Sequence, residues 1–191
     1  MRRIIPVSLI LLALTPWVQA VTFTIDPSHS SVSFRVKHVV GKVLGHFDQF
    51  NGIFNYDPAN LKTGSAQATI QIGSISTGIG KRDNHLRSPD FLEVQKFPVM
   101  TFKSTGITDV NGSHAKLHGD LMIHGVTRPV ILDLDVAGMA KDPMGPGQRA
   151  GATATTRIDR RDFGVGPTTG PIASMVGNDV EITIEVEGAS Q

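Results

Sequence analysis

The 191-residue sequence contains no cysteine. It therefore forms no disulfide, offers no thiol nucleophile or thiolate metal ligand, and has no cysteine to which a lipid could be attached. Stability must come from the packing of its core. Tryptophan and tyrosine occur once each, at Trp17 and Tyr56. Trp17 falls in a segment that we expect to be removed, so tryptophan fluorescence cannot report binding by the mature protein.

A surplus of charge of either sign is also missing. Lys and Arg total 18, Asp and Glu total 17, and the formal net charge is +1. Without Arg2 and Arg3 the counts become 18 − 2 = 16 and 17, a net charge near −1. This balance indicates no nucleic-acid partner and no polybasic segment. Long apolar runs occur only at the N-terminus, so we expect no stable membrane insertion.

The first 20 residues have the order of a secretory signal peptide. Arg2 and Arg3 precede the apolar run Ile4 to Leu14, and Val18-Gln19-Ala20 resembles a small-x-small cleavage site. The run is too short to span a bilayer. We predict a signal peptide over residues 1–20, cleavage after Ala20, and one exported domain over residues 21–191.

The dominant period in the remaining sequence is two. Apolar residues alternate with polar ones, which is typical of antiparallel strands with one buried and one wet face. The alternating segments are Ser31–His38, Phe50–Tyr56, Ala66–Ile72, Met100–Phe102, Ala115–Ile123, Val130–Val136 and Val180–Val186. Turn residues separate them at 56–60, 109–112 and 141–147.

The period breaks between Thr77 and Pro98, which predicts one short helical insertion around residues 80–95. Residues 81–87 suit a short helix. Ser88, Pro89 and Asp90 then have the pattern of a helix start, with a cap, a first-turn proline and a first-turn acid. The fold class is therefore all-β with a helical insertion.

About eight strands can form either a closed barrel or a two-sheet sandwich, and alternation does not distinguish them. Small residues recur on the apolar faces, at Ala66, Ala68, Ala115, Gly119, Ala152 and Ala154. They would allow two sheets to pack closely or leave interior volume for a ligand.

No motif indicates catalysis or metal binding. The seven histidines include no H-x-H or H-E-x-x-H spacing, and no G-x-S-x-G nucleophile motif is present. Asp133 and Asp135 lie two apart on a predicted exposed strand face, where solvated carboxylates are common. We predict no catalytic residue, no metal site and no cofactor.

Several blocks resemble the YceI-like family of bacterial periplasmic polyisoprenoid-binding proteins, in the same order along the whole mature chain. They are Phe34–His38, Val43–Phe47, Arg82–Leu92 with Phe97-Pro98, Gly119–Val130, Arg160–Gly164 and Gly177–Val180. The resemblance implies a periplasmic, extended eight-stranded antiparallel lipocalin-like barrel, with an amphiphile in its pore and residues 81–97 as a lid.

The same resemblance implies non-catalytic binding, storage or transport of an isoprenoid, such as a quinone or a polyprenyl lipid. The expected cavity lining is Val32, Phe34, Val36, Phe91, Leu92, Phe97, Phe102, Leu121 and Ile123. Arg82, His85 and Arg87 are expected at the lipid head group. The alternatives are a stress-response barrel filled by its own side chains, and an enzyme acting on a quinone or an isoprenoid. Whether the protein forms a homodimer stays open.

Overall fold

The structure is a computed structural model that describes residues 20–190. Residues 1–19 of the predicted signal peptide, which include Trp17, lie outside the described residues. Cleavage after Ala20 therefore stays a prediction.

Residues 20–190 are mostly β-strand, with two short α-helices and three 3-10 turns among them. The strands are β1 (Val21–Ile25), β2 (Ser31–His38), β3 (Gly41–Phe47), β4 (Phe50–Tyr56), β5 (Ser65–Gln71), β6 (Ile75–Ser76), β7 (Val99–Asn111), β8 (His114–Ile123), β9 (Val126–Lys141), β10 (Gln148–Asp159) and β11 (Val176–Ala189). The helical elements are η1 (Leu61–Thr63), η2 (Ile72–Ser74), α1 (Gly80–Arg87), η3 (Arg160–Phe163) and α2 (Gly170–Met175).

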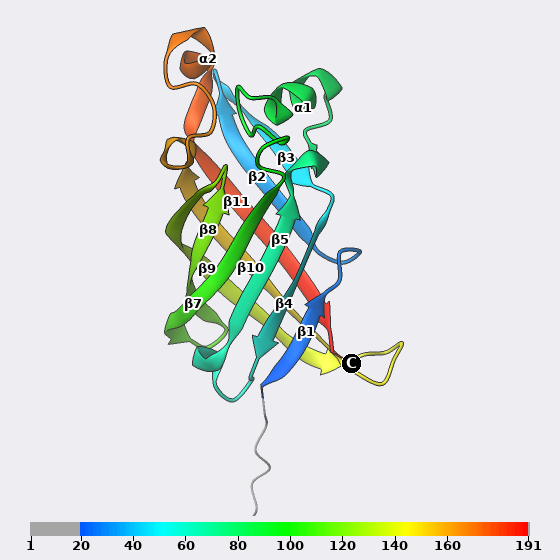
Figure 1. Ribbon diagram of the computed structural model, residues 1–191. Coiled ribbons are helices and arrows are strands. Elements are labelled where there is room, and N and C mark those ends of the chain that lie inside the picture. Colours follow the sequence, from blue (N-terminus) through cyan, green and yellow to red (C-terminus); the bar gives the residue numbers. More distant parts are fainter. Residues whose placement is uncertain (1–19, 191) are drawn as a thin grey trace, which may run out of the picture.

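The strands close into an antiparallel barrel with eight strand positions (Figure 1). The ring runs β1-β4-β5-β7-β8-β9-β10-β11 and closes where Thr24 and Ile25 of β1 pair with Ala189 and Gly188. Towards the other end of the barrel, β2 pairs with the edge of β11 that β1 uses at its own end. β3 pairs with β2, and β6 pairs with β3. The interruption between β1 and β2, residues 26–30, forms a seam in the barrel wall.

Both helices lie at one end of the barrel, which we call the helical end (Figure 1). The core there is a buried cluster around Ile72, Leu92 and Phe163, with Leu86 of α1 packed against it. A second cluster around Leu117 and Leu132 packs against Leu61 of η1 in the other half of the barrel.

The barrel fold and the alternating strands are confirmed, and the sandwich is excluded. The alternating segments did not include β1, β3, β6 or β10. The strand β10 was missed because Gln148–Asp159 carries small rather than large apolar residues on its inner face. Ala66, Ala68, Ala152 and Ala154 line an interior cavity, so their small side chains leave volume open. Gly119 instead makes room for the ring of Phe102, since a Cβ at 119 would lie 2.4 Å from two ring carbons.

The helical insertion is confirmed only over α1, and the expected helix start at Ser88 is wrong. Ser88 is the C-cap of α1, and its hydroxyl donates to the His85 carbonyl at 2.7 Å. Beyond it the chain turns back, with the Leu92 amide bonded to the Leu86 carbonyl and Glu93 at a φ of 45°. A left-handed residue cannot continue a helix.

The second helix, α2, was not predicted at all. Pro171 stands in its first turn, a recognised start signal, but six residues are too few to show a helical period.

Candidate functional site: an apolar cavity along the barrel axis

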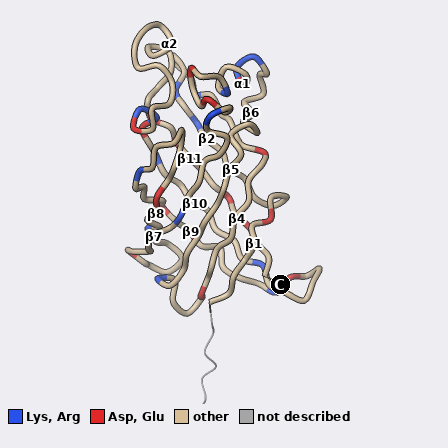
Figure 2. The backbone as a smooth tube through the Cα atoms, viewed as in Figure 1, with Lys and Arg blue, Asp and Glu red and all other residues tan. Residues whose placement is uncertain are grey.

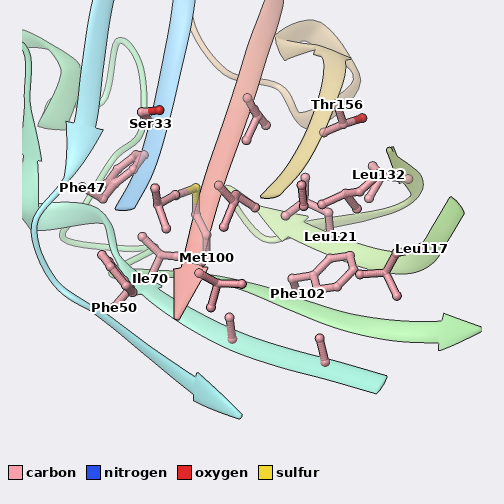
Figure 3. A pocket seen from close by; sticks show the side chains of 18 of the residues that line it. Ser33, Phe47, Phe50, Ile70, Met100, Phe102, Leu117, Leu121, Leu132 and Thr156 are labelled. Atoms are coloured by element: carbon pink, nitrogen blue, oxygen red, sulfur yellow. The ribbon is translucent and has the colours of Figure 1, made fainter. Parts of the chain in front are cut away.

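A cavity of about 300 Å³ occupies the interior of the barrel. Its lining extends from Leu86 and Val165 at the helical end to Leu61 and Gly64 at the opposite end. The walls are almost entirely carbon. Figure 3 shows Phe47, Phe50 and Ile70 on one side of the space, with Phe102, Leu117 and Leu121 facing it from strands β7 and β8.

Eight of the nine residues predicted to line a cavity do so. They are Val32, Phe34 and Val36 of β2, Phe91 and Leu92 of the segment after α1, Phe102 of β7, and Leu121 and Ile123 of β8. Phe91 and Leu92 are 7% exposed, so the segment after α1 does cover the barrel end as a lid would. Contact of these residues with a ligand stays a prediction.

Phe97 is not part of the lining, contrary to the prediction. Its ring packs on the β8–β9 turn, 4.4 Å from the His124 ring in an edge-to-face arrangement. A Cβ at Gly125 would lie 2.6 Å from a ring carbon of Phe97, so this glycine admits the ring. Phe97 therefore closes the outside of the turn rather than the cavity.

The three predicted head-group residues also lie outside the lining. Arg82 donates to the Thr77 carbonyl at 2.8 Å, and Arg87 donates to the carbonyls of Gly73 and Ile75 at 2.9 and 2.6 Å. His85 pairs with Asp90 at 3.0 Å. The two guanidinium groups fix α1 to the barrel wall, while a head-group role for all three residues stays untested.

The cationic side chain that does line the cavity is Arg160, which is only 5% exposed. Its guanidinium donates to the carbonyls of Gly177, Val165 and Pro167 at 2.7–3.1 Å and to the Asn178 side-chain oxygen at 3.0 Å. All four acceptors are uncharged, and no carboxylate within residues 20–190 makes an ion pair with it. Burial lowers the pKa of Arg160 from its ordinary value, but arginine stays protonated in proteins. The positive charge of Arg160, which the neighbouring Asp159 offsets in part, is thus held at the helical end of an apolar cavity.

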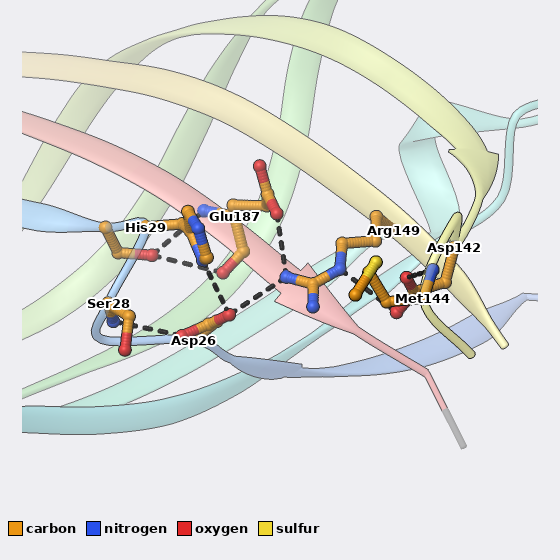
Figure 4. Close-up of polar contacts among 8 residues, drawn as sticks. Asp26, Ser28, His29, Asp142, Met144, Arg149 and Glu187 are labelled. Atoms are coloured by element: carbon orange, nitrogen blue, oxygen red, sulfur yellow. Dashed lines mark hydrogen bonds and ion pairs between the residues drawn. The ribbon is translucent and has the colours of Figure 1, made fainter.

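A second polar cluster surrounds Arg149 at the seam between β1 and β2 (Figure 4). The Nη1 atom of Arg149 lies 2.9 Å from a carboxylate oxygen of Asp26 and 2.8 Å from one of Glu187. Its Nε atom lies 3.1 Å from a carboxylate oxygen of Asp142. These carboxylates come from the seam, from β11 and from the β9–β10 loop. Hydrogen bonds from His29 and Arg149 hold the pKa of Asp26 well below its usual range.

Asp26, His29 and Glu187 also have the grouping of a three-ligand metal site, with ligand atoms within 4.8 Å of one another. Arg149 supplies the positive charge in that cluster, because it is bonded to both carboxylates. The geometry therefore fits a structural ion network at the seam.

Sequence reasoning missed several wall residues and Arg160. Ile70, Leu117, Leu132 and Ile184 have the inward parity of their strands, a signal that was present but not used for the lining. Arg160 had no such signal, because most of its partners are main-chain carbonyls.

Within residues 20–190 no helix is both long and apolar enough to cross a bilayer.

Closed antiparallel barrels around an apolar interior form a class of which lipocalins are an example, and this protein has that architecture. The YceI-like domain model matches residues 23–188, and the chain belongs to that family.

Individual proteins agree with this placement. A UPF0312 protein of Vibrio cholerae serotype O1 is 38% identical over 149 residues, covering 76% of this chain and 78% of that protein. The crystal structure of Burkholderia cenocepacia BcnA superposes with a TM-score of 0.74 at 28% identity, covering 85% of this chain and 98% of BcnA. A polyisoprenoid binding domain from Saccharophagus degradans, implicated in plant cell wall breakdown, superposes with a TM-score of 0.68. It covers 91% of this chain and 100% of its own, and at 18% identity the likeness is one of fold.

Proposed function

We propose that this protein binds a long apolar isoprenoid, such as a quinone or a polyprenyl lipid, in the barrel cavity, and stores or carries it in the periplasm without catalysis. The observation that carries the proposal is the continuous apolar cavity of about 300 Å³.

An empty cavity of this kind destabilises a folded protein. At roughly 24 cal/mol per Å³, a void of this size would cost on the order of 7 kcal/mol. That is comparable with the whole stability of a typical domain, about 5–15 kcal/mol. A barrel that keeps such a space is best explained by a ligand that fills it, which argues against an interior filled by its own side chains.

An isoprenoid tail suits these walls. Each buried methylene-sized group contributes roughly 0.8 kcal/mol, so a tail of several prenyl units binds without polar contacts. Arg160 favours an orientation in which the head group, with its oxygen atoms, lies at the helical end. A positive charge attracts a phenolic, carbonyl or phosphate oxygen more strongly inside an apolar site than in water.

The comparisons support the ligand class. The Saccharophagus degradans domain is described as polyisoprenoid binding, and this chain has its fold. The periplasmic location is supported by the basic start, the short apolar run and the Val18-Gln19-Ala20 site of the predicted signal peptide. Lack of cysteine is compatible with an oxidising compartment.

Native mass spectrometry of protein recovered from the periplasm tests this proposal, followed by organic extraction and identification of the released molecule. We expect one isoprenoid per chain. Protein that is recovered empty, and that takes up neither added quinones nor added polyprenols, would contradict it. Chemical turnover of a bound quinone by the purified protein would contradict the non-catalytic part.

A further inference from the structure

The hairpin between β2 and β3 ends in two exposed valines. His38 pairs with Gly41, so Val39 and Val40 alone form the turn. Val40 is 97% exposed and Val39 is 51% exposed. Met175, at the end of α2, is 39% exposed, and its carbonyl accepts a hydrogen bond from the Val39 amide at 2.8 Å. We call Val39, Val40 and Met175 the apolar tip.

Valine is a costly choice for this turn. Val39 has a φ of 53°, a conformation that a β-branched residue rarely adopts. Two-residue hairpin turns favour Asn, Asp or Gly, which reach positive φ with little strain. Val39 therefore strains the backbone, and both valines expose apolar surface, which points to a role outside the folding of the hairpin.

The hairpin that carries the apolar tip is basic, whereas the neighbouring strand β11 brings Asp179 and Glu181 alongside it. The hairpin, residues 31–47, contains Arg35, Lys37 and Lys42 and no Asp or Glu. Lys42 is paired with Glu181 of β11, while Lys37 has no ion-pair partner within the described chain. The adjoining segment, residues 163–178, has no charged residue at all, and the loop around α2 is free of blue and red in Figure 2.

Two residues of the cavity wall lie next to the apolar tip in the chain. Val36 lines the cavity three residues before Val39, about 10 Å along the strand. Val176 also lines it and directly follows Met175. The apolar tip therefore lies at the helical end of the cavity, with the exposed Lys37 and His38 between Val36 and Val39.

We propose that the apolar tip docks the barrel reversibly on an anionic lipid bilayer, with Val39, Val40 and Met175 in the interfacial region and Lys37 facing the lipid phosphates. Exposed apolar side chains beside a basic side chain bind such surfaces, because apolar area is buried and the basic group is attracted to anionic lipid. This is surface docking and requires no membrane-spanning segment. Docking itself is independent of the cavity's cargo, whereas its use in loading a ligand rests on the proposed function.

Flotation of the protein with vesicles tests docking directly. The vesicles contain phosphatidylglycerol and phosphatidylethanolamine, or phosphatidylcholine alone, and no isoprenoid, so the result does not depend on the cargo. We expect binding to the anionic vesicles that weakens with added salt. Val40→Ser should lower the partition coefficient about tenfold, and Lys37→Gln about fivefold.

Met144→Ser is the matched control. Met144 is 90% exposed in the β9–β10 loop at the opposite end of the barrel, and its replacement should leave flotation unchanged. Val39→Asn separates docking from folding, since asparagine tolerates positive φ. That variant should float less while unfolding at a higher temperature than the wild type.

Two results would overturn the proposal. One is the absence of flotation with anionic vesicles at low salt. The other is equal flotation of the wild type, Val40→Ser and Met144→Ser. If sedimentation instead shows a dimer that Val40→Ser dissociates and vesicle binding is absent, the apolar tip is a contact between two copies of this chain, and the bilayer proposal is wrong.

Discussion

Gly119 of β8 lies directly against the ring of Phe102 of β7, so that a Cβ at position 119 would come within 2.4 Å of two ring carbons. The ring thus owes its place in the cavity wall to the missing side chain. Gly45 has the same relationship to Phe34, at 2.3 Å. These two rings of the cavity wall are thus positioned by glycine on the neighbouring strand.

Gly119→Ala should therefore push the Phe102 ring into the cavity. We expect the fraction of protein that retains extracted lipid to fall severalfold, and the free energy of unfolding to fall by about 1–3 kcal/mol through overpacking. Gly106→Ala is the control, because a Cβ at 106 meets no atom within 4 Å. Full lipid occupancy in Gly119→Ala, measured by native mass spectrometry, would contradict this prediction.

Arg160→Met should destabilise the barrel and alter its ligand preference. The substitution leaves several partly buried carbonyls, including those of Gly177 and Val165, without donors, which lowers the free energy of unfolding in urea by about 3 kcal/mol. Arg160→Lys should recover only part of this, because an ammonium cannot reproduce the planar fork. Retention of lipids with anionic head groups should fall more than that of neutral ones. If Arg160→Met lowers the retention of anionic and of neutral lipids equally, Arg160 does not contact the head group.

The Arg149 cluster predicts a specific acid sensitivity. Hydrogen bonds lower the folded-state pKa of Asp26 and of Asp142, so their stabilising effect is complete above the ordinary aspartate pKa of about 4. It is lost as the pH falls toward the folded-state values. Arg149→Gln should therefore have a lower free energy of unfolding than the wild type at pH 6. The difference in unfolding free energy between the two proteins should become smaller below pH 4. A gap in urea midpoints that is independent of pH would show that Arg149 acts by packing alone.

Tyr56 provides an intrinsic optical probe. It lines the cavity, and it is the only tyrosine in a sequence whose only tryptophan is Trp17 of the predicted signal peptide. Tyr56 ends β4 close to Leu61, at the end of the cavity opposite Arg160. A quinone whose ring lies at the helical end should therefore leave tyrosine emission nearly unchanged while mass spectrometry detects the complex. Free tyrosine corrects for absorption by the quinone, and Tyr56→Phe gives the background emission. Saturable quenching of tyrosine emission would place the quinone ring beside Tyr56 and contradict the orientation assigned from Arg160.

The alternating strands could be predicted because their inward residues are large and regular, as with Val32, Phe34 and Val36. The same rule failed for β10, whose inner face carries Ala152 and Ala154, since small residues give little contrast with their polar neighbours. Phe97 was assigned to the lining with the rest of the lid segment, whereas its position depends on His124 and Gly125, which are distant from it in the sequence. The role of Arg160 was beyond reach, as its partners are carbonyl groups that every residue possesses.

The seam described above also determines when the cavity comes into existence. The closing pairs join β1 to β11, and Thr24 meets Ala189 across 189 − 24 = 165 positions of sequence. Contacts between residues so distant in sequence form slowly. A nascent chain that still lacks β11 is an open, curved sheet with an unpaired edge on β10, and it has no enclosed interior. Cargo therefore cannot be enclosed before β11 has joined β10 and β1, so loading takes place at or after this last step of folding.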